Sequence, residues 1–168
     1  TTAMLKWLKD YLKDSGDYSV FDRTVVWGAV MTAFFFLLRA SEYLVQQNRT
    51  WSQSRVVRGE DLTFKQAGQQ SNIETADEIV LHITQSKTDQ YNQGAFRNVF
   101  KTEEKLCPVD ALKDIYKLAP QRFTGKEKQA PLFRYEDGRP IKREHIQHLL
   151  ELSAVSQGIE AERMGSHS

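Results

Sequence analysis

The sequence contains a single cysteine, Cys107, so no disulfide can form within the chain, and this fits a reducing compartment. It contains no run of about 20 apolar residues, which argues against a membrane-spanning helix. No secretory signal pattern, internal repeat or low-complexity tract is visible. It also lacks a dense group of His, Cys or carboxylate side chains with metal-ligand spacing. We therefore expect a protein that is not secreted, has no membrane partner and holds neither a metal nor another cofactor.

What is present is the composition of an ordinary globular domain. The chain has 168 residues, of which 40% are hydrophobic and 27% are charged. This length is enough for one domain with a hydrophobic core. The net charge of +1 favours no class of partner, so a charged partner would have to be recognised by a local patch.

The most informative stretch is residues 25–44, VVWGAVMTAFFFLLRASEYL. Its first fourteen residues are uncharged, and Arg39 and Glu42 then follow. This pattern predicts a largely buried helix that begins at an N-cap, Asp22, and runs to about residue 45. A guanidinium beside a core is costly unless it is paired, and Glu42 at position i+3 could form that salt bridge. An anchored arginine can bind a phosphate with two hydrogen bonds, although a purely structural ion pair explains the same residues.

Three further helices are expected. Apolar residues at helical spacing indicate an amphipathic helix over residues 4–12, ended by Ser15-Gly16. Pro108 near the N1 position begins a helix that stops at Ala119-Pro120. A last helix is expected over residues 142–155. In the central helix, Gly28 would permit a close contact with another helix.

Three strands are expected, over residues 61–64, 78–84 and 95–101. The second and third are joined by turn-forming residues 86–94 and would make a β-hairpin that carries Lys87 near its tip. The polar stretch 66–76 is expected to be a loop. The predicted fold class is therefore α+β, a mostly helical domain with a small three-stranded antiparallel sheet.

Cationic side chains gather in two segments. The loop 46–59 has no acidic residue but has an aromatic one, which favours contact with phosphates. Cations at the start of the last helix oppose the helix dipole, which costs a little stability. A phosphate bound there would turn this cost into a gain, because the free amides and the cationic side chains would bind it together. Alternatively, the loop 46–59 is simply a solvated basic loop, and the start of the last helix is simply a solvated basic turn. With the hairpin arginine added, the candidate DNA-binding residues are Arg49, Arg55, Arg58, Arg97, Arg139, Lys142 and Arg143.

Three motifs occur in a fixed order: Leu-Leu-Arg-Ala-Ser-Glu, Ser-Lys-Thr-Asp and Gly-Ser-His-Ser. In this order and fold context, the chain resembles the catalytic domain of the tyrosine recombinases, the phage-integrase family. It is most similar to the recombinases of eukaryotic mobile elements of the Crypton and DIRS kinds. The segments that begin at Cys107-Pro108 and Leu132-Phe133 also resemble the connecting segments of that family.

The resemblance implies site-specific DNA recombination or integration, in which strands are cleaved and rejoined through a 3′-phosphotyrosyl intermediate. It implies a double-stranded DNA partner and leaves open a homo-oligomer on that DNA. The first catalytic arginine of the family would be Arg39, with Glu42 as its supporting acid. The hairpin lysine would be Lys87, the acid for the leaving oxygen, and the histidine of the family's His-x-x-Arg box would be His167.

Parts of the family pattern are missing. The second arginine of the box and the nucleophilic tyrosine would follow Ser168, and a DNA-clamping domain would precede Thr1. We therefore interpret residues 1–168 as a single catalytic-type domain without those parts, inactive as an isolated chain. Two alternatives remain: a domesticated, non-catalytic DNA-binding module and a helical protein-interaction domain. The expected location is the nucleus for a eukaryotic mobile element and the cytoplasm otherwise.

Overall fold

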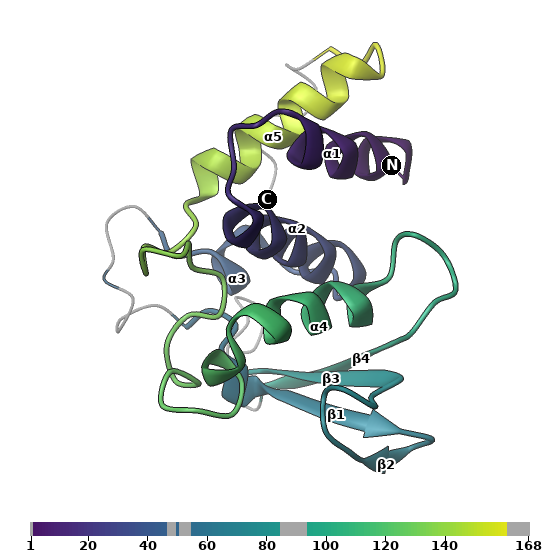
Figure 1. Ribbon diagram of the computed structural model, residues 1–168, viewed down its shortest axis with the longest axis vertical. Coiled ribbons are helices and arrows are strands. Elements are labelled where there is room, and N and C mark those ends of the chain that lie inside the picture. Colours follow the sequence, from purple (N-terminus) through teal and green to yellow (C-terminus); the bar gives the residue numbers. More distant parts are fainter. Residues whose placement is uncertain (1, 47–49, 51–54, 85–93, 161–168) are drawn as a thin grey trace.

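The computed structural model describes residues 2–46, 50, 55–84 and 94–160. Figure 1 shows three layers: an antiparallel sheet, a middle layer of two helices, and an outer layer in which the first and last helices pack together. The helices are α1 (Thr2–Asp14), α2 (Val20–Phe35), α3 (Ala40–Tyr43), α4 (Pro108–Leu118) and α5 (Arg143–Ser156), with 3-10 turns η2 (Gly59–Asp61) and η3 (Pro120–Arg122). The α+β class is confirmed.

The sheet has four strands, so the prediction of three was wrong. They are β1 (Leu62–Gln66), β2 (Gln69–Gln70), β3 (Glu78–Ile83) and β4 (Ala95–Phe100), in the order β2-β1-β3-β4. The additional strand, β2, lies in the stretch expected to be a loop. Ala67 and Gly68 have φ values of 49° and 77°, which is the left-handed pair that a two-residue hairpin turn requires. The chain therefore reverses at once, and Gln66 pairs with Gln69.

The predicted β3–β4 hairpin is confirmed, with Ile79 opposite Val99 in an antiparallel register. Alternate residues of the sheet are buried, among them Leu81 of β3, and this face belongs to the hydrophobic core shared with the helices. The opposite face includes Phe96 and Phe100 of β4, which are 71% and 59% exposed.

The middle layer depends on the close approach of α2 and α4. A Cβ atom added to Gly28 would lie 2.3 Å from Cδ1 of Ile115, so the predicted role of this glycine in a close helix contact is confirmed. The start of α4 also agrees with the sequence. Pro108 occupies the first helical positions, and the Cys107 Sγ at the N-cap accepts a hydrogen bond from the Asp110 backbone N–H, at 3.4 Å.

The central helix is shorter than predicted, and both predicted ends were wrong. The N-cap is Ser19, whose Oγ accepts the backbone N–H of Asp22 at 3.0 Å. At the other end the helix stops at Phe35 because Leu37 is left-handed, with φ of 53°. The Leu38 N–H then reaches back to the carbonyl of Ala33, at 2.9 Å, in a Schellman termination. A glycine usually occupies this position, so a leucine there is strained.

We expect Gly59→Ala to destabilise the fold by roughly 2 kcal/mol or more, as overpacking against rigid backbone does. The added Cβ would lie 1.9 Å from the carbonyl oxygen of Arg122, in η3. Urea denaturation measures the change in the free energy of unfolding. As a comparison, Gly16→Ala meets no atom within 4 Å but has φ of 73°, so it should cost only about 1 kcal/mol of backbone strain. Equal losses in the two variants would contradict the close approach of η2 to η3.

Candidate functional site

Arg39 lies at the N-cap of α3 and is exposed. Its backbone N–H donates to Glu42 Oε2 at 2.8 Å, and the Glu42 N–H donates back to the Arg39 carbonyl at 2.9 Å. The predicted salt bridge between the two side chains is not among the ion pairs of the described residues. The carboxylate, which is buried, instead holds the backbone of the arginine. Glu42 therefore fixes the backbone of Arg39, and the arginine is exposed.

Glu42 also ties a second basic segment to α3. Its backbone carbonyl accepts the Val57 N–H at 2.9 Å. The Val57 carbonyl in turn accepts the Leu132 N–H at 3.0 Å, so this segment is fixed on both sides. Arg55, two residues earlier and exposed, consequently lies close to the α3 turn.

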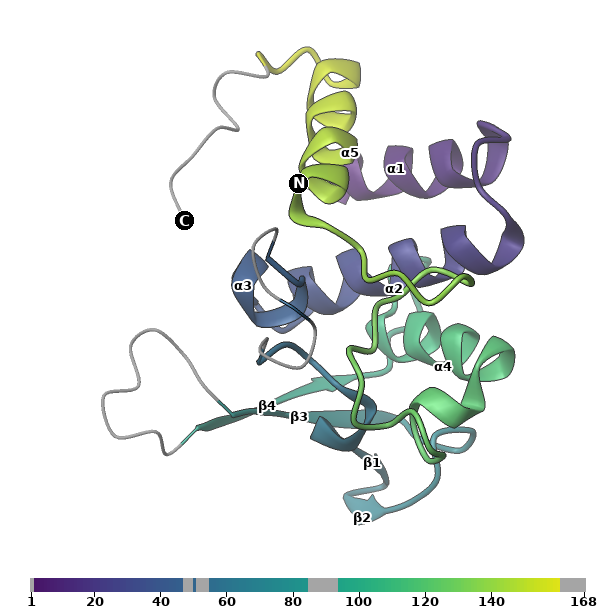
Figure 2. The ribbon, with the colours of Figure 1, turned by 90° about the vertical axis from the view of Figure 1, so that its left-hand side faces the viewer.

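Arg97 connects the hairpin to the turn that carries Arg39. From β4, its Nη1 donates to the carbonyl of Phe36 at 2.5 Å and to the carbonyl of Leu37 at 2.9 Å. These carbonyls lie just beyond the last turn of α2, where a cation also interacts favourably with the helix dipole. We expected Arg97 to contact DNA, and the structure assigns it an additional role as a cap. Figure 2 shows α3 and the connected ends of β3 and β4 on the same side of the molecule.

The start of α5 reaches the same region. Lys142, the N-cap of α5, forms a parallel β-bridge with Val45, two residues after α3. Arg143 is close enough to Tyr43 to lower the pKa of its hydroxyl, although burial dominates and raises that pKa to about 12. Lys142 and Arg143 are both exposed, so α5 adds two cations beside α3.

Arg139, three residues before Lys142, is paired with an acid, so we do not count it with the cations around α3. Its Nε donates to Asp137 Oδ2 at 2.7 Å, and its guanidinium lies 5.9 Å from the ring centre of Tyr135. The turn that contains it is bound to the beginning of α2, because the Glu136 N–H donates to Asp22 Oδ1 at 2.8 Å. Arg39 follows the opposite end of α2, a helix of 16 residues that is about 24 Å long.

Four other candidates need separate mention. Arg58 is half-buried, and its backbone N–H donates to Asp61 Oδ2 at 2.9 Å at the start of η2. Arg49, Lys87 and His167 lie outside the described residues. The structure thus brings Arg39, Arg55, Arg97, Lys142 and Arg143 around α3, and we call these five residues the basic face.

A buried arginine that the sequence did not reveal supports this arrangement. Arg122 is 4% exposed, and its guanidinium donates to the carbonyls of Arg134 at 2.6 Å and Tyr135 at 3.0 Å. It also lies 4.9 Å from the ring centre of Phe21. Burial, and to a smaller extent the nearby cation Arg134, lower its pKa to about 10. Arg122 therefore fixes the segment that leads to Lys142.

A second polar group was also missed. Tyr18 Oη lies 2.7 Å from His145 Nε2, and Tyr135 Oη bonds to His145 Nδ1. A neutral imidazole donates through one ring nitrogen and accepts through the other, so it suits two hydroxyl partners. Burial lowers the pKa of His145, His148 lowers it further, and Asp22 opposes the shift. The cluster joins the α1–α2 connection, the turn before α5, and α5. No local sequence pattern indicates such a contact.

Within the described ranges, no three His, Cys, Asp or Glu side chains are grouped so that they could hold a metal ion. None of the helices in this part of the chain is long and apolar enough to cross a membrane.

No protein-family model matches the chain, and neither a curated protein nor a solved structure matches it. The relationship to the tyrosine recombinases therefore rests on the sequence motifs and remains a proposal.

Replacing Arg97 with alanine removes two charge-assisted hydrogen bonds to the end of α2. Because the side chain is exposed, we expect a loss of roughly 1 kcal/mol in the free energy of unfolding. Chemical denaturation measures this change. Arg139→Ala is the matched control, since its ion pair with Asp137 is exposed and should contribute almost nothing. A neutral Arg97→Ala would contradict the role of Arg97 as a cap.

His145 should make the stability depend on pH. Its pKa is lower in the folded protein than in the unfolded chain, so the unfolded chain binds more protons as the pH falls. The free energy of unfolding should therefore decrease as the pH falls through about 6.5 and level off below the folded pKa. Urea titrations across this range, compared with His145→Gln, measure the slope. The exposed His148→Gln should retain most of it, and a slope unchanged by His145→Gln would contradict the role of His145.

Proposed function

We propose that the basic face binds the phosphate backbone of double-stranded DNA, with Arg39 as the phosphate clamp of a tyrosine-recombinase-type site. The observation that carries the proposal is how Glu42 fixes the Arg39 backbone while the arginine itself is exposed. The contact fixes the backbone from which the arginine side chain projects, and a guanidinium can donate two parallel hydrogen bonds to a phosphate.

The cations around Arg39 favour a long, repeatedly charged anion over a small one as the ligand. Arg55 comes from the segment bound to Glu42, and Lys142 and Arg143 come from the start of α5. These cations are distant in sequence but surround one short helix, so they suit a backbone that carries a charge at each repeat. Contacts of this kind position DNA without reading its sequence, so binding should be salt-sensitive and only modestly selective.

The proposed reaction is a pair of transesterifications. A tyrosine oxygen attacks the phosphorus of a phosphodiester, the bond to the 5′ oxygen breaks, and that oxygen leaves as a hydroxyl after it receives a proton. Attack by a 5′-hydroxyl then releases the tyrosine and rejoins the strand. Arg39 would stabilise charge on the non-bridging oxygens, where one preorganised donor contributes about 3 kcal/mol. Lys87 as the acid and His167 as a second donor rest on the sequence motifs alone.

One buried tyrosine and two half-buried ones are not suited to the role of nucleophile. Burial raises the pKa of Tyr43 and of Tyr135 to about 12, which opposes formation of the phenolate. Burial also raises the pKa of Tyr18, whose hydroxyl is hydrogen-bonded to His145. We therefore propose DNA binding and phosphate positioning for this chain and assign the nucleophile to none of these three residues.

One observation favours the alternative of a protein-interaction domain. A pocket of about 230 Å³ between α1, α2 and α5 is lined mainly by apolar side chains, among them Leu5, Val30 and Ile146. Phe34 at its edge is 41% exposed, and the nearby strained Leu37 is 78% exposed. Such a surface would suit an apolar partner segment.

The DNA proposal predicts that Arg39→Ala weakens binding to duplex DNA about tenfold at low salt, because one bidentate phosphate contact is lost. The slope of log affinity against log salt concentration should also fall by about one unit. Fluorescence anisotropy with a labelled duplex of mixed sequence, at several salt concentrations, measures both quantities.

Arg139→Ala removes an equal charge at the opposite end of α2 and serves as the control, with little expected change in affinity. Circular dichroism spectra should confirm that both variants are folded. Equal effects of the two substitutions would contradict a localised basic face. If the unmodified chain does not bind DNA even at low salt, the proposal fails and the interaction-domain alternative gains support.

A further inference from the structure

A second, separate pocket lies beside β1 and β2, whereas Arg97 lies on β4 at the opposite edge of the sheet. Its volume is about 510 Å³, which is within the range of small-molecule sites. It opens between β1 and the residues after β2 on one side and the end of α4 with the segment after η3 on the other. The one residue of the basic face that belongs to the sheet, Arg97, is on β4 at the opposite edge. The proposed DNA contacts therefore leave this pocket unused.

The floor of the pocket is apolar and aromatic. Leu62 and Phe64 of β1 project into it, and Phe123 and Tyr116 close it from the side of α4. The ring centre of Phe123 lies 6.3 Å from that of Phe64 and 5.7 Å from that of Tyr116, with the latter pair edge to face. A further flat ring can pack against such a cluster in offset or edge-to-face geometry.

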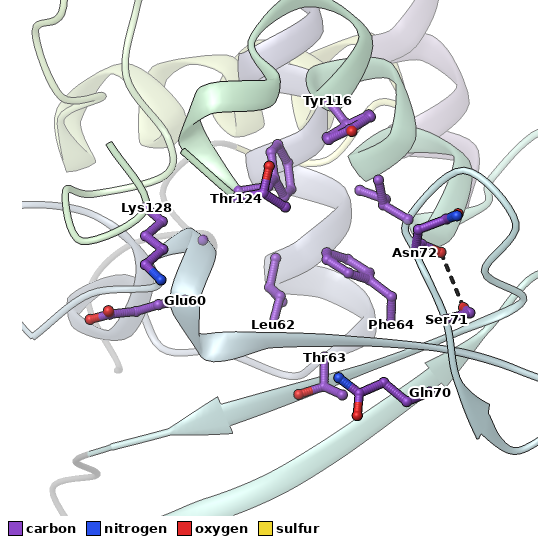
Figure 3. A pocket seen from close by; sticks show the side chains of 13 residues that line it. Glu60, Leu62, Thr63, Phe64, Gln70, Ser71, Asn72, Tyr116, Thr124 and Lys128 are labelled. Carbon is purple, nitrogen blue, oxygen red and sulfur yellow. Dashed lines mark hydrogen bonds between the residues drawn. The ribbon is translucent and has the colours of Figure 1, made fainter. Parts of the chain in front are cut away.

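One end of the pocket carries two opposite charges, Glu60 and Lys128, whose side chains are not in ion-pair contact among the described residues. The Glu60 N–H donates to the Lys128 carbonyl at 3.1 Å, so the two residues are neighbours. Figure 3 shows both side chains at the same end of the pocket, with Leu62 next along it and Phe64 farther away. Across the described part of the chain, however, neither side chain takes part in an ion pair or a side-chain hydrogen bond.

The backbone around this end is preorganised. Gly59 allows η2 to approach η3 so closely that a Cβ would overlap the Arg122 carbonyl. At the other end, the side-chain oxygen of Asn72 accepts the N–H and hydroxyl of Thr75, both at 3.0 Å, so the amide of Asn72 is held in place. The pocket thus has a charged end, an aromatic floor and an amide end.

We propose that this pocket binds an α-amino acid with an aromatic side chain. The ammonium group would pair with Glu60 and the carboxylate with Lys128, because a zwitterion presents both charges a short distance apart. The ring would lie over Phe64 and Phe123, and the amide of Asn72 would face a polar ring substituent such as an indole N–H or a phenol hydroxyl.

The balance of charges favours a zwitterion over other ligands of similar size. A purely apolar molecule would cover the two charged groups without pairing them, which is unfavourable. A phosphorylated ligand would be attracted by one cation and repelled by the adjacent carboxylate. Only a ligand with both signs of charge satisfies both residues at once.

The test is titration of the ¹⁵N-labelled chain with L-tryptophan, monitored by NMR chemical shifts. We expect saturable shifts for the residues that line the pocket, such as Gly59, Leu62 and Phe123. 3-Phenylpropionate lacks the ammonium, L-phenylalanine amide lacks the carboxylate and glycine lacks the ring, so each should bind at least about tenfold more weakly than L-phenylalanine. Equal binding of 3-phenylpropionate, or shifts confined to another part of the chain, would overturn the proposal.

Variants provide a second criterion. Glu60→Gln and Lys128→Gln should each weaken tryptophan binding about tenfold, because each removes one charge-assisted contact. The control replaces Glu103 and Lys105 with glutamine, an exposed pair of the same charges outside the pocket, and should bind normally. DNA affinity should be unchanged in all of these variants, so this proposal and the DNA proposal can fail independently. Undiminished tryptophan binding by both Glu60→Gln and Lys128→Gln would overturn the assignment.

Discussion

The termination of α2 is the constraint on which the rest of the site depends. Leu37 is left-handed, and this conformation costs roughly 1–2 kcal/mol for a residue with a side chain. Arg97 offsets part of that cost by donating to two carbonyls at the helix end, where a cation contributes about 0.3–1 kcal/mol through the helix dipole alone. The same contact fixes β4 against the turn between α2 and α3. The end of α2, the exposed position of Arg39 and the position of β4 therefore all depend on the same turn.

The regular elements were largely predictable because their signals are local. Pro108 marks the start of α4, and the β-branched run of residues 78–83 predicts β3. The end of α2 was not predictable, since residues 34–44 contain neither glycine nor proline and their stop is stabilised by Arg97, 60 residues further on. The turn at Ala67-Gly68 was overlooked because β2 is too short for its two glutamines to show a strand pattern.

The candidate site was predictable in part, for the same reason. Arg39 and Glu42 could be found because they follow an uncharged run, but their mode of contact depends on the helix break. The pairing of Arg139 with Asp137, in a turn bound to Asp22 at the start of α2, depends on how that turn folds and was not apparent from the sequence. The contacts of Arg122 and His145 join segments from different parts of the chain, so no sequence pattern could reveal them.

The packing of α1 against α5 has a consequence for how the chain folds. These are the first and last helices of the described residues, so their contact closes almost the longest loop available. Loop closure of this length carries a large entropic cost, whereas the β3–β4 hairpin forms from neighbouring residues. We therefore expect the sheet with α2 and α4 to form a nucleus to which α5 docks late. If α1 and α5 detach from the rest of the fold as a pair, Lys142 and Arg143 leave the basic face while the rest of the core stays intact. Such local unfolding would lower the positive charge of the basic face.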